Sequence, residues 1–168
     1  MNRICRKSRA SAVHDAWQVV VIAGVTALGG IETTEAILGH SRVIAVVGLS
    51  DMPEKPSYSV ARYLQSQGYR IIPVNPKLTG PVLGEEPYRT LDDVLEKVDL
   101  VDIFRRSIDV PPVIEAAIRI KASAVWLQLG IVHEEAAKAA RAAGIDVVMD
   151  RCTAIEHRRL VSDGKLTS

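Results

Sequence analysis

Short apolar segments alternate along most of the chain with segments that have helical spacing. The apolar segments are typical of strands buried on both faces of a sheet, and they cover residues 43–47, 70–74, 98–104, 124–129 and 145–149. Glycine, proline or threonine marks the ends of most intervening segments, at 33–39, 56–68, 91–96, 113–120, 133–143 and 154–160. This alternation predicts an α/β fold, a doubly wound sheet of about five parallel strands with helices on both faces.

The alternating pattern defines one domain, expected at residues 33–162 and followed by a polar tail at 163–168. A chain of 168 residues has the length of a single domain and can bury a core without disulfides or metal. Residues 1–32 form an N-terminal extension, in which a basic start precedes an apolar run at 16–27. That outline fits a secretory signal peptide, and the alternatives are an added strand or helix or an upstream extension. The run is too short to span a bilayer as a helix.

Charge and composition narrow the classes of partner. Lys and Arg number 21 and Asp and Glu number 20, so the net charge of +1 argues against a globally basic nucleic-acid coat. Aromatic residues make up only 4%, which argues against stacking platforms for single strands. Cys5 and Cys152 are far apart and belong to no Cys-x-x-Cys pair, so a disulfide framework or a cysteine zinc site is not expected. We expect a cytoplasmic protein that binds neither nucleic acid nor a membrane.

The loop after the first predicted strand is the first candidate for ligand binding, because doubly wound folds bind ligands at the carboxyl ends of their strands. It begins Gly48-Leu49-Ser50 and continues to Pro56-Ser57 at the start of the next helix. Only the first glycine of a dinucleotide fingerprint is present. Gly48 still permits a close approach to a phosphate, and two serine hydroxyls and a helix N-terminus lie nearby in sequence. The loop therefore predicts a phosphate site, with an ordinary turn as the alternative.

The segment after the second strand reads Val74-Asn75-Pro76-Lys77. It lacks the acidic residue that holds the ribose hydroxyls of NAD. Lys77 would instead attract an additional phosphate, which favours a nucleotide such as CoA, with its 3′-phosphate, or NADP, with its 2′-phosphate. The alternative for Lys77 is a solvated surface lysine.

The third strand ends in Phe104-Arg105-Arg106. Guanidinium groups at this edge are suited to bind phosphate with forked donors. Adjacent side chains point apart, so we expect only one of the two to reach a ligand, and the sequence does not say which. The alternative is an ion pair with Asp99, Asp102 or a helix carboxylate.

Three further candidates follow the fourth and fifth strands. Gln128 is suited to bond an amide or a pantetheine carbonyl, and Gly130 permits the backbone to approach a ligand closely. Cys152 is expected at the N-terminus of the last helix, as a reactive thiol or as a small buried residue. His157 is a conceivable base for it, but five positions do not place the two on the same helical face. The chain shows no assembled catalytic set and no metal-ligand cluster.

Six segments in order resemble the small stand-alone CoA-binding domain proteins, which are similar to the N-terminal CoA-binding domain of the succinyl-CoA synthetase alpha subunit. The segments are 46–50, 56–61, 73–76, 101–106, 125–130 and 149–152, within a resemblance that covers residues 33–160. The resemblance implies a Rossmann-like fold with CoA across the carboxyl edge of the sheet. It implies phosphate at Gly48–Ser50, the adenosine end along residues 74–77, and the neighbouring part of the nucleotide at Phe104–Arg105.

Three functions are compatible with these residues. The first is binding of coenzyme A or an acyl-CoA by a non-catalytic binding or regulatory module, in a homo-oligomer or with an unknown protein partner. The second is an enzyme that depends on NADP or another nucleotide, and the third is a protein-interaction module with a vestigial pocket. The resemblance favours the first, because the synthetases react through a phosphohistidine in a second domain, for which these residues offer no counterpart.

Overall fold

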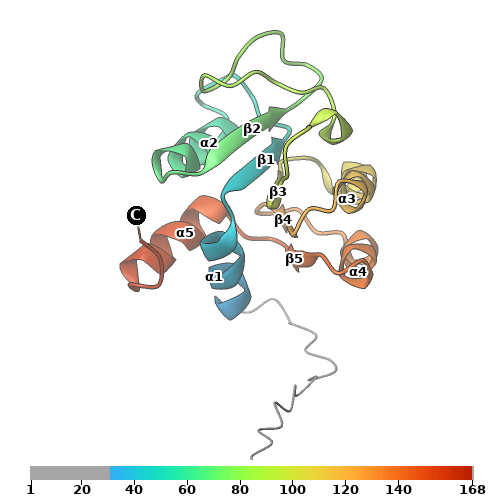
Figure 1. The fold of residues 1–168 in the computed structure, drawn as a ribbon. Helices are drawn as coiled ribbons and strands as arrows, with labels where there is room; N and C mark the ends of the chain where they lie inside the picture. Colours follow the sequence, from blue (N-terminus) through green and yellow to red (C-terminus); the bar gives the residue numbers. More distant parts are fainter. Residues whose placement is uncertain (1–30, 168) are drawn as a thin grey trace, which may run out of the picture.

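The computed structural model of the chain describes residues 31–167, so the expectations for residues 1–30 lie outside the described part. Five strands form one sheet (Figure 1). They are β1 (Val43–Val47), β2 (Arg70–Val74), β3 (Leu100–Ile103), β4 (Ala124–Leu127) and β5 (Asp146–Val148). The helices are α1 (Ile31–His40), α2 (Pro56–Ser66), α3 (Val110–Arg119), α4 (Glu134–Ala142) and α5 (Thr153–Ser162), with 3₁₀ turns η1 (Leu91–Asp93) and η2 (Ser107–Asp109).

The sheet is entirely parallel and has the strand order β2-β1-β3-β4-β5. The chain first adds β2 on one side of β1 and then crosses to the other side to add β3. The topological switch point therefore lies between β1 and β3, where crossovers leave in opposite directions and open a crevice at the carboxyl edge. The predicted fold of about five parallel strands is confirmed.

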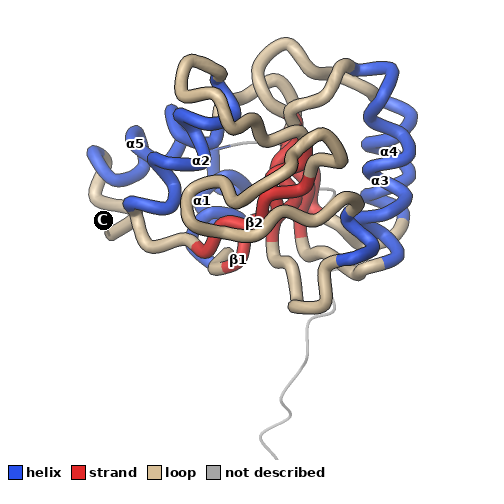
Figure 2. The backbone as a smooth tube through the Cα atoms, turned by 90° about the horizontal axis from the view of Figure 1, so that it is seen from above, coloured by secondary structure: helices blue, strands red, loops and turns tan. Residues whose placement is uncertain are grey.

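Helices cover both faces of the sheet. Figure 2 shows α1, α2 and α5 on one side of the strands and α3 and α4 on the other. Alternate strand residues point to the two layers, so that Ile44 and Val46 pack toward α2 and α5 while Ala45 and Val47 pack toward α3. Because both faces are covered, the strands are composed mainly of apolar residues.

The ends of the elements follow local sequence, with two differences from the prediction. Prolines lie in the first turn of α2 and of α3. Proline is tolerated there because the N–H groups of the first turn have no hydrogen-bond acceptor within the helix. Helix α3 begins at Val110, earlier than the pattern indicated. The predicted helix at 91–96 is only the turn η1, capped reciprocally by Thr90 and Asp93, because the backbone is already extended at Val94.

The apolar strands contain one buried acid. Asp102, in β3, is fully buried beneath the carboxyl edge. Its Oδ1 accepts a hydrogen bond from Nε2 of Gln128 at 2.7 Å, and its Oδ2 accepts one from Oγ1 of Thr153 at 3.0 Å. Nε2 of Gln128 also donates to Oγ1 of Thr153 at 2.8 Å. This group, the Asp102 cluster, joins β3, the end of β4 and the start of α5.

Burial dominates the electrostatics of Asp102. It raises the pKa of the carboxyl to about 7, although hydrogen bonds from Gln128 and Thr153 favour the charged form. Between the ordinary value of about 3.9 and this raised value, the folded protein keeps a proton that the unfolded chain has lost. Stability from this group is therefore present at acidic pH and is lost as pH rises toward 7.

Within residues 31–167, no helix has the length and apolar character to cross a membrane.

We predict that Asp102→Asn reduces the fall in stability between pH 5 and pH 8, because the amide cannot ionise. The free energy of unfolding of the wild type, measured with urea, is expected to fall by roughly 2 kcal/mol more than that of the variant over this range. Asp146→Asn, at an exposed position in β5, is the matched control and is expected to retain the wild-type slope. Parallel pH profiles for wild type and Asp102→Asn would contradict the assignment.

Candidate functional site

A pocket of about 660 Å³ lies at the carboxyl edge of the sheet. It is bounded by the loop after β1, the ends of β3 and β4, and the N-terminus of α5, and thus spans the topological switch point. The lining residues are Gly48, Ser50, Lys55, Pro56, Ser57, Val60, Phe104, Arg105, Arg106, Gln128, Leu129, Ile131 and Cys152. Most sequence-predicted site residues are therefore brought together here.

Gly48 allows the chain to leave β1 across the end of β3. Its φ is +89°, and a Cβ on it would lie 2.4 Å from the carbonyl oxygen of Phe104. The backbone N–H of Gly48 donates to the carbonyl of Val74 at 2.8 Å, so the turn is also tied to β2. Only glycine combines this backbone conformation with so close an approach.

The serines of the loop after β1 organise its backbone. Oγ of Ser57, at the start of α2, accepts from the N–H of Ser50 at 3.1 Å, and Oγ of Ser50 accepts from the N–H of Met52 at 3.1 Å. Each hydroxyl keeps its own proton to donate. The loop is therefore shaped by local hydrogen bonds while its polar atoms border the pocket.

Helix α2 begins at the pocket with a cation beside it. Lys55 occupies the N-cap position and Pro56 follows as the first helical residue. The Lys55 side chain is exposed and lines the pocket. Helix N-termini attract anions through their free N–H groups and dipole, and an ammonium group at the same place adds a full positive charge.

The two adjacent arginines differ in their partners. Nε of Arg106 donates to Oδ2 of Asp109 at 2.8 Å, in an exposed ion pair. Arg105 is half-buried, and its Cδ lies 3.1 Å from the position that a Cβ on Gly48 would take. Within the described part of the chain, Arg105 forms no hydrogen bond or ion pair. The hydrogen bond from Arg106 and, to a smaller extent, the charge of Arg105 lower the pKa of Asp109, but the guanidinium of Arg105 donates no hydrogen bond within residues 31–167 and is the better suited of the two to receive an anion at the pocket.

The segment after β2 flanks this pocket without lining it. Nδ2 of Asn75 donates to the carbonyl of Leu49 at 2.9 Å, and its Oδ1 accepts from the N–H of Lys77 at 3.1 Å. Asn75 therefore ties this segment to the loop after β1. Leu49 and Val74 are buried beneath the surface, whereas Pro76 and the Lys77 side chain are exposed.

The residues directly after β4 form hydrogen bonds that stabilise the carboxyl edge of the sheet. Gln128 lines the pocket, but both protons of its Nε2 are donated within the Asp102 cluster. Its amide nitrogen is therefore not available to a ligand. Gly130 lies outside the lining, with a φ of +75° and its N–H donated to Oδ1 of Asp150 at 2.7 Å.

Cys152 and His157 do not form a catalytic pair. Cys152 is the half-buried N-cap of α5 and lines the carboxyl-edge pocket. His157 is buried, and its Nδ1 lies 3.0 Å from the hydroxyl of Tyr63. Burial, together with the nearby Arg158, lowers the pKa of His157 below its ordinary value. The imidazole lines a different pocket, at the opposite end of the molecule.

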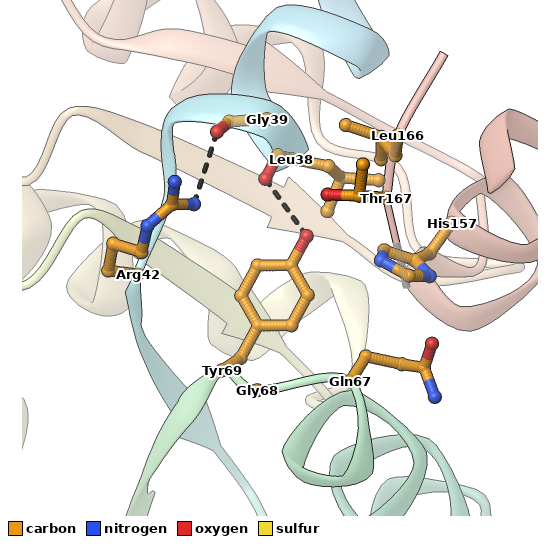
Figure 3. A pocket seen from close by; sticks show the side chains of 9 residues that line it. All are labelled: Leu38, Gly39, Arg42, Gln67, Gly68, Tyr69, His157, Leu166 and Thr167. Atoms are coloured by element: carbon orange, nitrogen blue, oxygen red, sulfur yellow. Dashed lines mark hydrogen bonds between the residues drawn. The ribbon is translucent and has the colours of Figure 1, made fainter. Parts of the chain in front are cut away.

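That second pocket, of about 260 Å³, lies toward the amino edge of the sheet (Figure 3). The Tyr69 hydroxyl donates to the carbonyl of Leu38 at 2.9 Å, and Nη1 of Arg42 donates to the carbonyl of Gly39 at 3.2 Å. Tyr69 and Arg42 thus bind backbone carbonyls of the same pocket, whereas the side chains of Lys55 and Arg105 in the carboxyl-edge pocket form no hydrogen bond within residues 31–167. Residues 31–167 contain no group of three or more His, Cys, Asp or Glu side chains able to hold a metal ion.

A doubly wound parallel sheet with a pocket at its topological switch point defines the Rossmann-like α/β class of fold. The family described as "CoA binding domain" matches residues 42–158. The chain belongs to this family, which confirms the resemblance drawn from the six sequence segments.

The relatives include bacterial and archaeal proteins. An uncharacterized protein of Bacillus subtilis, YneT, is 40% identical over 121 residues, which cover 72% of this chain and 89% of that protein. A solved structure from Thermus thermophilus is 41% identical with a TM-score of 0.74, covering 78% of this chain and 98% of that one. A dinucleotide-forming acetyl-coenzyme A synthetase of Ca. Korarchaeum cryptofilum is 27% identical with a TM-score of 0.60, covering 66% of this chain but 26% of the synthetase.

Sequence reasoning missed four of the lining residues. Lys55 could have been predicted from the sequence, because a basic residue directly before Pro56 borders a helix N-terminus. Val60 faces the pocket from the first turns of α2, and Leu129 and Ile131 border it beyond β4. The sequence does not mark these three apolar residues as site residues, because side chains of this type are expected to pack in the core.

We predict that Gly48→Ala is more destabilising than a substitution that strains the backbone alone. Gly68→Ala is the matched control, because Gly68 has a φ of +90° but no atom lies within 4 Å of its hypothetical Cβ. The control is expected to lower the free energy of unfolding by about 1–2 kcal/mol, and Gly48→Ala by distinctly more. Urea denaturation measures both values. Equal losses would contradict the close approach of Gly48 to β3.

Proposed function

We propose that this protein binds coenzyme A or an acyl-CoA in the carboxyl-edge pocket, as a binding or regulatory module without chemistry of its own. The observation that carries the proposal is the unpaired guanidinium of Arg105 beside Gly48, at the switch point of a CoA-binding-family fold. A half-buried guanidinium without a protein partner is suited to receive a phosphate.

The order of the strands suggests how the ligand lies. The diphosphate would occupy the loop at Gly48–Ser50 and the N-terminus of α2, within reach of Lys55 and Arg105. The adenosine end would extend over β2 toward Asn75, with Lys77 near the 3′-phosphate. The pantetheine arm would extend the other way, over the ends of β3 and β4 toward Cys152.

The chemistry of the lining supports binding rather than turnover. The lining residues include no carboxylate and no histidine, and Cys152 is the one nucleophile of thiol type among them. The carboxyl of Asp102 is covered by Gln128 and donates or accepts only within its own cluster. The carboxylates and imidazoles that most often act as general acids or bases are therefore missing from the lining of the described pocket.

The test is isothermal titration calorimetry on reduced protein with CoA, dephospho-CoA and NADP. We expect CoA to bind and Arg105→Ala to weaken binding of both CoA and dephospho-CoA by about 10–100-fold, the value of one charge-assisted hydrogen bond. Lys77→Ala is expected to weaken CoA alone, because dephospho-CoA lacks the 3′-phosphate that Lys77 would bind. Arg141→Ala and Lys138→Ala, exposed on α4, are the matched controls.

Two outcomes would overturn the proposal. Absence of heat for all three ligands would leave the protein without a nucleotide and favour an interaction module. Tighter binding of NADP than of CoA would favour the NADP-dependent enzyme instead.

A further inference from the structure

The exposed apolar side chains gather at the carboxyl edge of the sheet. Large hydrophobic side chains are strongly exposed at six described positions: Met52, Leu95, Ile108, Leu129, Val132 and Ile155. All except Leu95 lie in a loop that follows the carboxyl end of a strand or in the helix turn that such a loop enters. Exposed apolar groups that cluster on one edge mark a binding surface, whereas scattered ones do not.

Four apolar side chains lie in the loops after β3 and β4, and two of them line the pocket. Leu129 and Ile131, just beyond β4, line the pocket itself, and Leu129 is 59% exposed. Val132 follows directly, and its N–H donates to Oγ of Ser107 at 3.3 Å. This bond holds the turn η2 against the loop after β4. Ile108, the residue after Ser107 in this turn, is 77% exposed. We call Ile108, Leu129, Ile131 and Val132 the apolar rim.

The pocket is therefore polar at one end and apolar at the other. Lys55 and Arg105 lie at its β1 and β3 side, while the apolar rim lies at the β3 and β4 side. This division matches a ligand with a polyanionic head and an apolar tail. Free CoA ends in a polar pantetheine arm and a thiol, and would leave the apolar rim in water.

We propose that the physiological ligand is an acyl-CoA with an apolar acyl chain, and that the chain lies along the apolar rim. This inference rests on the proposed function, because the coenzyme portion must first occupy the cationic end. Each methylene that leaves water on binding contributes favourably, so affinity should rise with chain length. Acetyl-CoA, whose acyl group is too short to cover the rim, should bind about as tightly as CoA.

Calorimetry with CoA, acetyl-CoA and octanoyl-CoA tests the proposal. Octanoyl-CoA is expected to bind at least about tenfold more tightly than acetyl-CoA, well within the transfer free energy of six added methylenes. The double variant Ile108→Ser/Val132→Ser is expected to remove most of this difference while leaving the affinity for CoA unchanged. Leu95→Ser, an exposed apolar position before β3 and away from the rim, is the matched control and should keep the difference.

The failures of the two proposals are distinguishable. If CoA itself does not bind, the proposed function fails. If CoA binds and octanoyl-CoA binds no more tightly than acetyl-CoA, or if its advantage survives in the double variant, the acyl assignment is overturned. Sedimentation of the ligand-free protein tests whether a second copy of the chain occupies the apolar rim instead. If the wild type is a dimer, the double variant is a monomer and octanoyl-CoA has no advantage, the apolar rim is a dimer interface and the acyl assignment is overturned.

Discussion

The carboxyl-edge pocket depends on one close approach, that of Gly48 to the carbonyl of Phe104. A Cβ at this position would lie 2.4 Å from that oxygen, so β1 turns away from the sheet directly over the end of β3. The same turn is tied to β2 through the N–H of Gly48 and the carbonyl of Val74. Three strands thus fix the loop from which α2 begins, and the helix N-terminus and Arg105 are consequently held at one side of the crevice.

A second constraint lies beneath the pocket. The Asp102 cluster joins β3, β4 and the first residue of α5 by hydrogen bonds of 2.7 to 3.0 Å. It uses the amide of Gln128, which the sequence marked as a ligand group, to hold the pocket floor. Because burial raises the pKa of the Asp102 carboxyl to about 7, the stability that this group contributes is lost as pH rises toward neutrality. Within residues 31–167, the side chains of Lys55 and Arg105, which line the pocket, by contrast form no hydrogen bond.

The fold was predictable because every strand is buried on both faces and reads as an apolar run between helix start and stop signals. The position of the pocket was predictable too, since doubly wound folds have their crevice at the carboxyl ends of the strands. The hydrogen-bond and ion-pair partners of individual side chains could not be predicted. Adjacent arginines look alike in sequence, and only the position of Asp109 in η2 separates Arg106 from Arg105. The exposure of Leu129 depends on how the loops after β3 and β4 meet, which no local pattern records.

The central claim is that the coenzyme occupies the switch-point pocket with its phosphates at the loop after β1. A crystal structure of the protein grown with CoA tests this most directly. The account predicts the diphosphate against Gly48 and Ser50, with the guanidinium of Arg105 in contact with it and the pantetheine arm extending toward Cys152. Density for CoA at the amino-edge pocket beside Tyr69 and Arg42, with the carboxyl-edge pocket filled by water, would contradict it.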